Sequence, residues 1–479
     1  MIRAATDRLV GWLARLVALG FYRSVEVVGA ELVPSRRPVV VVSNHFNGMV
    51  DALIVASTLR RLPRFIAKST LWKVWPARPC LAFAGVIPIH RREDGGGDNR
   101  SSFHACHEAL AHGHTIAIFP EGTTHFRPHL DPIRTGAARI ALGAVEQGVG
   151  GLVILPIGLA FEDLMEVRSR VLVRVGQPID LDTELDQLLP EGARAGEDDR
   201  AAVHALNDEI TDRLRAVSPD YADLREQGTM RLVAEVSARV EGGVSGGPEV
   251  PLAVIEPTAQ RLAQGPEASR QTVEGSVSSY VLDLALAHLR DEDLDSSHGF
   301  VPLLGRLVLT TVLVAVMLPV AALGVAANLV PALAVYEAGV YIRAPVTKGT
   351  VRLLVALIMF PVVWIVLAIV FVDGIGRGFG FCILVAAAGL LAVWLVHHVR
   401  VLVRLWAAWW ARRVRAFMVG PLVSHRRDVA ASVHLALDAD QAAGVDAGGM
   451  GAASTGDSAA VDPAAVGSAG IDPGAGRVI

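Results

Sequence analysis

The chain has 479 residues, of which 52% are apolar and 19% charged, and its mean hydropathy of +0.43 is high for a soluble protein. We therefore expect part of the chain to reside in a membrane. The formal net charge of −4 gives no basic bias, which argues against a nucleic-acid partner. Three cysteines (Cys80, Cys106 and Cys382) lie far apart, which argues against a disulfide framework and fits a reducing compartment.

Residues 1–23 predict an amphipathic helix, with arginines spread among Leu, Val, Trp12 and Phe21. The segment is too short and too charged to span a bilayer, so we expect it to lie on the membrane surface. Packing of the same helix on the neighbouring domain explains the pattern equally well. Arg15 interrupts the apolar run and no small-residue cleavage site follows, so we expect no cleavable signal peptide.

Residues 24–181 alternate short apolar runs with helix-like segments, which predicts an α/β domain with a mixed, largely parallel sheet. One helix is expected from a cap at Asn99 through Leu110, and another over residues 135–146. The expected strands are Val39–Val42, Arg64–Ala67, Thr115–Phe119, Leu152–Ile157 and Val171–Val175.

The remaining chain divides into three parts. Residues 182–300 are charged and predict helices, with a Gly/Pro-rich break at 241–248. Residues 301–420 predict a membrane domain of two or three apolar helices, because each run of about 20 residues gives about 30 Å of helix. The runs are Leu307–Ala327, Leu353–Val372 and Gly378–Val396. Residues 421–479 are expected to be disordered, because the tail is mostly Ala, Gly, Asp and Ser from about Asp428 onward and has few apolar side chains larger than alanine after Leu437.

Charge around the apolar block constrains its topology. A basic, Trp-rich segment follows the third run, and Arg343, Lys348 and Arg352 lie between the first two, so both stretches favour the cytoplasmic side. Two crossings and a re-entrant or kinked first run satisfy both requirements, and Pro319 and Gly324 make such a kink plausible.

The most informative stretch joins a buried strand to a helix. Val39–Val42 ends in a polar loop with His45, and Asp51 follows near the start of the next helix. An imidazole at this place can take a proton at neutral pH, and a carboxylate on its other ring nitrogen would fix its tautomer. This requires the chain to bend back between the two residues. Taken alone, an unrelated loop histidine and helix-start aspartate explain the stretch as well.

Three further clusters lie in the same domain. An apolar run ends in Arg91 and Arg92, whose guanidinium groups suit a phosphate. Phe119–His125 follows a strand and carries Glu121 and Gly122, and Arg134 then precedes a helix N-terminus, which favours an anion. Pro156 lies in an apolar strand suited to lining a groove. Each cluster alone also has an ordinary structural explanation.

Together and in this order, the His45–Asp51 stretch, Gly-x-Ile-Pro-Ile-x-Arg91, Phe-Pro-Glu121-Gly-Thr and Leu-Pro156-Ile-Gly resemble the glycerophospholipid acyltransferase family (PlsC-like). The resemblance covers about a third of the chain. Five residues separate His45 from Asp51, where the family usually has four. This spacing is similar to a bacterial and fungal branch that includes glycerol-3-phosphate as well as lysophosphatidate acyltransferases.

The resemblance implies a function and roles. His45 would be the general base and Asp51 its orienting acid. Substrate binding would fall to Asn44, Arg91, Glu121, Gly122, Thr123 and Pro156. The implied reaction is acyl transfer from acyl-CoA or acyl-ACP to a glycerophosphate hydroxyl, with lysophosphatidate as the expected acceptor and glycerol 3-phosphate as the alternative. It needs no metal or cofactor, and it places the enzyme at the cell membrane with its catalytic domain facing the cytoplasm.

Two other functions stay open at this point. A metal hydrolase would use the dense histidines, which are His90, His104, His107, His112, His114, His125 and His129. However, no carboxylate has the expected spacing along the sequence. A non-catalytic membrane scaffold is the second alternative, but the apolar block lacks the ionisable residues that would mark a transport path.

Overall fold

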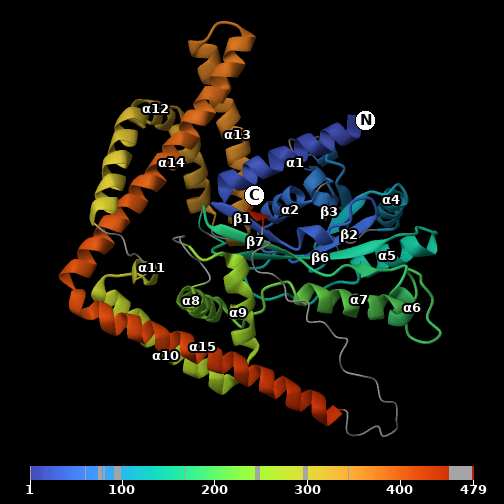
Figure 1. Ribbon diagram of the computed structural model, residues 1–479. Coiled ribbons are helices and arrows are strands. Elements are labelled where there is room, and N and C mark those ends of the chain that lie inside the picture. The colour runs from blue at the N-terminus through green and yellow to red at the C-terminus, as the bar shows by residue number, and fades with distance from the viewer. Residues whose placement is uncertain are drawn as a thin grey trace. The chain divides into compact units, whose positions relative to one another are not determined.

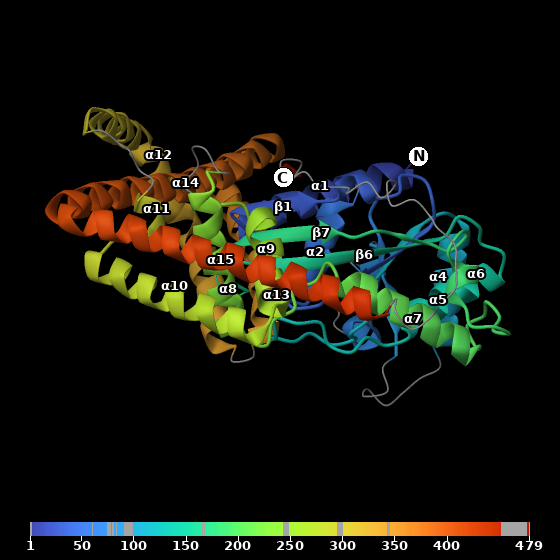
Figure 2. The same cartoon turned by 60° about the horizontal axis from the view of Figure 1, so that its bottom comes forward.

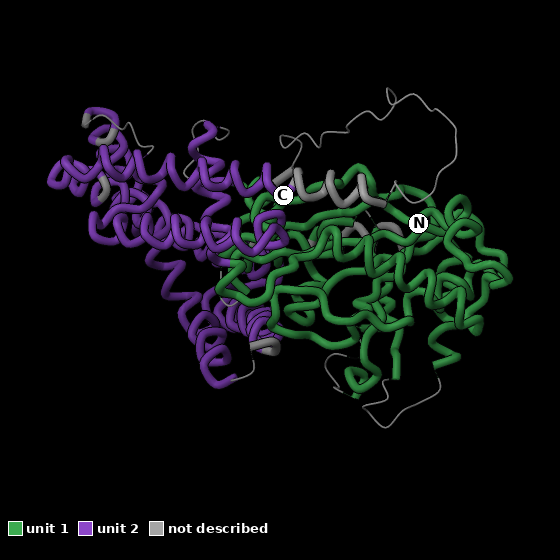
Figure 3. Tube along the Cα trace, turned by 90° about the horizontal axis from the view of Figure 1, so that it is seen from below, with its two compact units in different colours: residues 1–227, 251–260, 460–479 green, residues 228–250, 261–459 purple. Residues whose placement is uncertain are grey.

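The computed structural model describes residues 2–59, 61–73, 78, 81–82, 84–90, 99–164, 166, 168–242, 249–294, 300–342, 345–451 and 477–478. The chain forms two compact units (Figure 3). The first comprises Met1–Gln227, Pro251–Gln260 and Ala460–Ile479, and the second comprises Gly228–Val250 and Arg261–Ala459. Arg91 and Arg92 lie outside the described residues, as does Cys80.

The first unit is built on a nine-stranded sheet in the order β4-β3-β5-β2-β6-β7-β1-β9, with β8 also paired to β6. Pairs of β2 with β5 and β6, of β3 with β4 and β5, and of β1 with β7 are parallel. Pairs β6–β7, β6–β8 and β1–β9 are antiparallel. The strands are β1 (Ser24–Val28), β2 (Val39–Ser43), β3 (Arg64–Lys68), β4 (Ile87–Ile89), β5 (Thr115–Ile118), β6 (Val153–Phe161), β7 (Arg170–Val175), β8 (Ile179–Asp180) and β9 (Arg477–Val478). This confirms the predicted mixed, largely parallel sheet.

Strand β2 lies inside the sheet between β5 and β6, and every residue in it is buried. It is hydrogen-bonded on both edges, and such a strand needs apolar, β-branched side chains on both faces. Helices α4 (Arg100–Ala111), α5 (Gly136–Glu146) and α7 (Arg200–Arg215) share one core with Val40 and Val42. Helices α1 (Ile2–Phe21) and α2 (Met49–Thr58) lie on the other side of the sheet (Figure 1).

The N-terminal helix α1 packs on its own domain. Arg15 Nε donates to the carbonyl of Ser57 in α2 over 2.8 Å, and Tyr22 is buried. Trp12 and Leu16 remain 57% and 46% exposed. Packing on the domain, one of the two explanations of this helix, is therefore present, and contact of Trp12 and Leu16 with a membrane surface stays a prediction.

The helical region does not begin a new unit at residue 182. Helix α6 (Leu185–Leu188) and α7 belong to the first unit, and Leu206 and Ile210 of α7 are fully buried in its core. The predicted boundary is wrong because the apolar face of α7 covers the sheet. The other helices of this region are α8 (Leu224–Val240), α9 (Leu252–Gln264), α10 (Glu267–Ala287) and α11 (Asp291–Leu294).

The apolar block contains helices α12 (Phe300–Tyr341), α13 (Pro345–Phe371) and α14 (Ile375–Val414). All three are long and apolar enough to cross a membrane. Pro319 and Pro331 lie inside α12, which is bent rather than straight (Figure 1). Neither proline divides α12 into two helices, and the number of crossings stays a prediction.

A buried amide joins the three apolar helices. Asn328 of α12 donates to the carbonyl oxygens of Gly324 (2.8 Å) and Val385 in α14 (3.2 Å), and accepts from Trp364 Nε1 in α13 (2.8 Å). A Cβ on Gly324 would lie 2.3 Å from the carbonyl oxygen of Ala388, so glycine permits the close approach of α12 and α14. Small residues and interhelical hydrogen bonds are what hold apolar helices together in lipid.

The prediction that residues 421–479 are disordered is wrong for their first part. Helix α15 (Ala416–Gly451) runs beside α10 (Figure 2). It buries Leu422, Val429 and Val433, and Arg426 contacts Asp291 over 3.0 Å. A helix needs only one apolar stripe at helical spacing, and alanine, the best helix former, fills much of the rest. Residues 452–476 lie outside the described residues.

Candidate active site

The histidine and aspartate that follow β2 meet. His45 lies in the loop and Asp51 in the first turn of α2, and His45 Nδ1 is 2.9 Å from Asp51 Oδ2. Gly48, with φ at +51°, turns the chain between them. Since an ionised carboxylate only accepts hydrogen bonds, Nδ1 carries the proton and Nε2 keeps its lone pair. The predicted geometry of the pair is confirmed.

Asp51 is fully buried. Its Oδ2 also accepts from the backbone N–H of Asn47 over 2.7 Å, whereas Oδ1 has no hydrogen-bond partner among the described residues. Burial and the charge of Asp51 raise the pKa of the Tyr22 hydroxyl, and a hydrogen bond with Asn47 opposes this rise. The carboxylate of Asp51 is thus shielded from water.

The ring of His45 stacks on Phe119 at the end of β5, with ring centroids 4.0 Å apart and an interplanar angle of 12°. Phe65 of β3 lies beyond it at 6.3 Å from Phe119. The His45 side chain is 13% exposed, so it is neither sealed in the core nor freely solvated. No hydrogen bond engages its Nε2 among the residues described, which leaves that atom available as a base.

Asn44, which we expected to bind substrate, is instead fully committed to the fold. Its Nδ2 donates to the carbonyl of Leu159 over 2.9 Å, and its Oδ1 accepts from the N–H of the same residue over 2.7 Å. The side chain is 0% exposed. Leu159 lies on β6 just beyond the β2–β6 pairing, so the amide continues that pairing with a side chain.

Glu121, also expected at the substrate, is buried and occupied by protein donors. Its Oε1 accepts from the backbone N–H of His45 over 2.7 Å, and its Oε2 accepts from the N–H of Asp131 over 2.9 Å and from His125 Nε2. Both carboxylate oxygens therefore have protein donors, and a role for Glu121 at the substrate stays a prediction. Glu121 ties the loop after β5 to the loop after β2.

Gly122 needs its conformational freedom. Its φ is +73°, and a Cβ would lie 2.8 Å from Nε of Arg134, the exposed cation that precedes α5. Thr123 follows it in the same loop and is partly buried. An arginine and a helix N-terminus therefore lie next to the glycine turn, which is an arrangement suited to an anion.

The predicted phosphate ligand Arg91 lies outside the described residues, although the strand before it is placed. Strand β4 pairs in parallel with β3, so its carboxyl end lies at the sheet edge where β2 and β5 end.

The cap predicted at Asn99 is wrong in one respect. Its side chain does not cap α4 but pairs with both backbone groups of His90, each over 2.8 Å.

Pro156 lies in β6 opposite Val42 and is buried. A Cβ on Gly176 would be 3.0 Å from its Cγ, so the ring packs against β7's end. The structure brings Pro156 near the carboxyl end of β2 but gives its side chain a packing role. A role beside the acyl chain remains a prediction.

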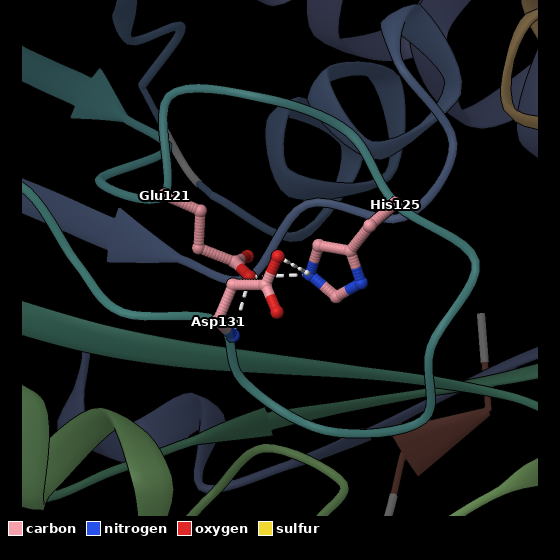
Figure 4. A group of neighbouring side chains, drawn as sticks. All are labelled: Glu121, His125 and Asp131. Atoms are coloured by element: carbon pink, nitrogen blue, oxygen red, sulfur yellow. Dashed lines mark hydrogen bonds and ion pairs between the residues drawn. The ribbon is translucent and has the colours of Figure 1, made fainter.

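Among the described residues, one cluster has the spacing of a metal site, namely Glu121, His125 and Asp131 (Figure 4). Sequence spacing missed it because the loop folds the carboxylates around His125. However, His125 Nδ1 accepts from the N–H of Arg127 over 3.3 Å, so Nε2 carries the ring proton and donates to Glu121. A protonated nitrogen has no lone pair for a metal.

Part of the chain is similar to known proteins. The family model described as Acyltransferase matches residues 24–160, which confirms the predicted resemblance for that segment. Glycerol-3-phosphate O-acyltransferase 1 of Saccharomyces cerevisiae is 34% identical over 138 residues, 28% of this chain and 18% of its own length. Glycerol-3-phosphate O-acyltransferase 2 of the same yeast is 32% identical over 148 residues, 30% of this chain and 19% of its own length.

A bacterial relative is matched over more of its length. Lyso-ornithine lipid O-acyltransferase of Pseudomonas aeruginosa is 34% identical over 152 residues, 31% of this chain and 52% of that protein. The crystal structure of the 1-acyl-sn-glycerophosphate acyltransferase PlsC from Thermotoga maritima aligns with a TM-score of 0.33 and 19% identity, over 44% of this chain and 77% of that one. This chain thus spans about half or less of the length of these curated relatives.

Proposed function

We propose that this chain is a membrane-bound O-acyltransferase that moves a fatty acyl group from an acyl thioester to a hydroxyl of a glycerophosphate. The observation that carries the proposal is the 2.9 Å contact between His45 Nδ1 and a fully buried Asp51. It leaves Nε2 as a base, inside the segment that matches the Acyltransferase family model.

The reaction follows from this pair. Nε2 of His45 takes the proton of the acceptor hydroxyl as its oxygen attacks the thioester carbonyl. Asp51 stabilises the resulting imidazolium. The tetrahedral intermediate collapses, the carbon–sulfur bond breaks, and the imidazolium returns the proton to the departing thiolate. A thioester already has a good leaving group, so neither an acyl-enzyme nor a metal or other cofactor is required.

The acceptor phosphate needs cations near the base. The resemblance assigns this role to Arg91, a guanidinium that suits a phosphate bidentately. Arg134 and the N-terminus of α5, beside Gly122, support a second positive region at the same loop. Both would hold the headgroup while its hydroxyl reaches His45.

Two acceptors are in question. The family resemblance favours lysophosphatidate, which would give phosphatidic acid, and the names of the two yeast relatives favour glycerol 3-phosphate as the alternative. Acyl-CoA or acyl-ACP would supply the chain. Three helices able to cross a membrane support a reaction at the bilayer, and a cytoplasmic acyl donor requires the catalytic domain to face the cytoplasm.

The test is an assay of membranes that contain the protein, with radiolabelled lysophosphatidate in one arm and glycerol 3-phosphate in the other. We expect acyl transfer in one arm, abolished in a His45→Ala variant that reaches the membrane at wild-type level. His104, an exposed histidine of α4, provides the matched control as His104→Ala. Full transfer by His45→Ala would refute the mechanism. Absence of transfer to any glycerophosphate would favour a scaffold, and metal-dependent hydrolysis would favour the hydrolase.

A further inference from the structure

One loop holds the backbone of His45 at both ends. The N–H of His45 donates to Glu121 Oε1 over 2.7 Å, and its carbonyl accepts from the N–H of His125 over 3.4 Å. The ring of the next residue, Phe46, meets the His125 ring edge-on at 5.2 Å between centroids. Asp51 fixes the direction of the His45 ring, whereas this loop fixes where its Cα lies.

Glu121 can hold His45 only if it is itself held. Its side chain is completely buried, and its second oxygen depends on two donors, the N–H of Asp131 at 2.9 Å and Nε2 of His125. A buried carboxylate that loses a donor carries a large desolvation cost, and it either moves or takes up a proton. His125 is the only side chain among these donors, so it is the point that a substitution can address.

The groups around His125 determine its protonation, and with it the proton that its ring donates to Glu121. Besides Glu121, it faces the carboxylate of Asp131 at 4.0 Å, which is paired with Arg127, and the ring of His129 at 6.3 Å between centroids. Burial and Arg127 oppose a second ring proton, but Glu121 and Asp131 outweigh them and raise the pKa of His125. In either ionisation state, Nε2 carries a proton toward Glu121.

We propose that His125 is a positioning residue for acyl transfer, which acts by donating from Nε2 to Glu121 and so fixes the backbone of His45. The proposal rests on the proposed role of His45 as the base. It requires a hydrogen-bond donor at this position, and it does not require a charge or a proton exchanged with substrate. It also assigns Glu121 to the support of the base and not to the acceptor.

Kinetics separate this role from substrate binding. His125→Ala should lower kcat by about a hundredfold, because a displacement of about 1 Å at a catalytic group has that effect. The acceptor KM should change by less than about threefold, since no ground-state contact is lost. His125→Gln retains an N–H at the place of Nε2 and should restore most of kcat, and His104→Ala should match the wild type.

The pH profile provides the second criterion. The wild type and His125→Gln should show the same dependence of kcat on pH, because His125 takes no part in proton transfer. A displaced profile in His125→Gln would overturn the proposal, as would a normal kcat in His125→Ala or a loss confined to KM. If His125→Ala does not fold, Glu121→Gln serves in its place. Whichever way its amide turns, an N–H₂ group faces at least one N–H donor, and with the oxygen toward His125 and Asp131 that donor is the backbone N–H of His45. Glu121→Gln should therefore lose kcat as well, and a fully active Glu121→Gln would overturn the proposal.

A chemical measurement tests positioning without any acceptor. Carbethoxylation of His45 by diethyl pyrocarbonate, followed by peptide mass spectrometry, should be faster in His125→Ala than in His125→Gln or the wild type by about threefold or more, because the loop opens more often. Equal rates would overturn the proposal even in an active enzyme. An inactive wild type with a faster His45 in His125→Ala would refute the acyl-transfer function and leave the positioning intact.

Discussion

Asp51 offers a sharp test of how the base is held, because one of its oxygens makes both contacts. Oδ2 accepts from His45 Nδ1 (2.9 Å) and from the N–H of Asn47 (2.7 Å), whereas Oδ1 is buried without a partner among the residues described. In Asp51→Asn, the amide oxygen can take the place of Oδ2 and keep both contacts. The tautomer of His45 is then preserved, and only the negative charge is lost.

The expected loss is therefore moderate. Replacing a charge-assisted hydrogen bond by a neutral one costs about 1–2 kcal/mol, which corresponds to a fall in kcat of about 5- to 30-fold. Asp51→Ala removes the acceptor, frees the ring and strands two donors, so we expect a fall of about a thousandfold or more. The amide N–H₂ in place of Oδ1 should also lower the free energy of unfolding by about 1–3 kcal/mol, because it is buried without a partner.

The assay is acyl transfer with saturating thioester in membranes, with the two variants matched for folded protein by thermal unfolding. An Asp51→Asn variant as inactive as Asp51→Ala would refute the reasoning that one oxygen orients the ring. Full activity in both variants would remove Asp51 from the mechanism altogether.

Three further predictions concern the membrane helices and the sheet. Asn328→Leu should lower the unfolding free energy of the apolar block by about 1–2 kcal/mol, measured by denaturation in detergent. The substitution removes the hydrogen bonds of Asn328 with Gly324, Val385 and Trp364. Unchanged stability would contradict this. Arg37 contacts Asp180 at 2.6 and 2.7 Å, and this guanidinium lowers the pKa of that carboxyl despite some desolvation. Stability from this pair is present above the carboxyl's ordinary pKa and is lost as the pH falls through the lowered one. The difference in melting temperature between wild type and Asp180→Asn should therefore begin to shrink below about pH 4 and vanish once the pH is below the lowered pKa; a constant difference would contradict it. A reporter fused after Phe300 should read cytoplasmic, and a periplasmic reading would refute the topology of two crossings with a kinked first run.

Local patterns were enough to predict the sheet, the apolar helices and, with the family resemblance, the His45–Asp51 contact. Each depends on local pattern: a buried valine run, a polar loop at a strand end, and runs of about 20 apolar residues. The sequence did not reveal that Asn44 and Glu121 belong to the fold. Their partners lie 115 and 76 residues away along the chain, and a polar side chain next to a catalytic histidine has the same pattern whether it faces substrate or backbone.

Helix α15 was missed for a different reason. Composition averages over all faces of a helix, whereas Val429 and Val433 need only one neighbouring surface to become buried. The carboxylates around His125 were missed because a loop, with no periodicity, brings residues 121, 125 and 131 together.

Tyr22, which directly follows α1, connects the amino-terminal helix to the loop that carries His45. Tyr22 is buried and its hydroxyl hydrogen-bonds the side chain of Asn47, whose backbone N–H in turn donates to Asp51. A protein shortened to begin at Ser24 would lose this hydrogen bond, and with it one support of the loop that carries His45.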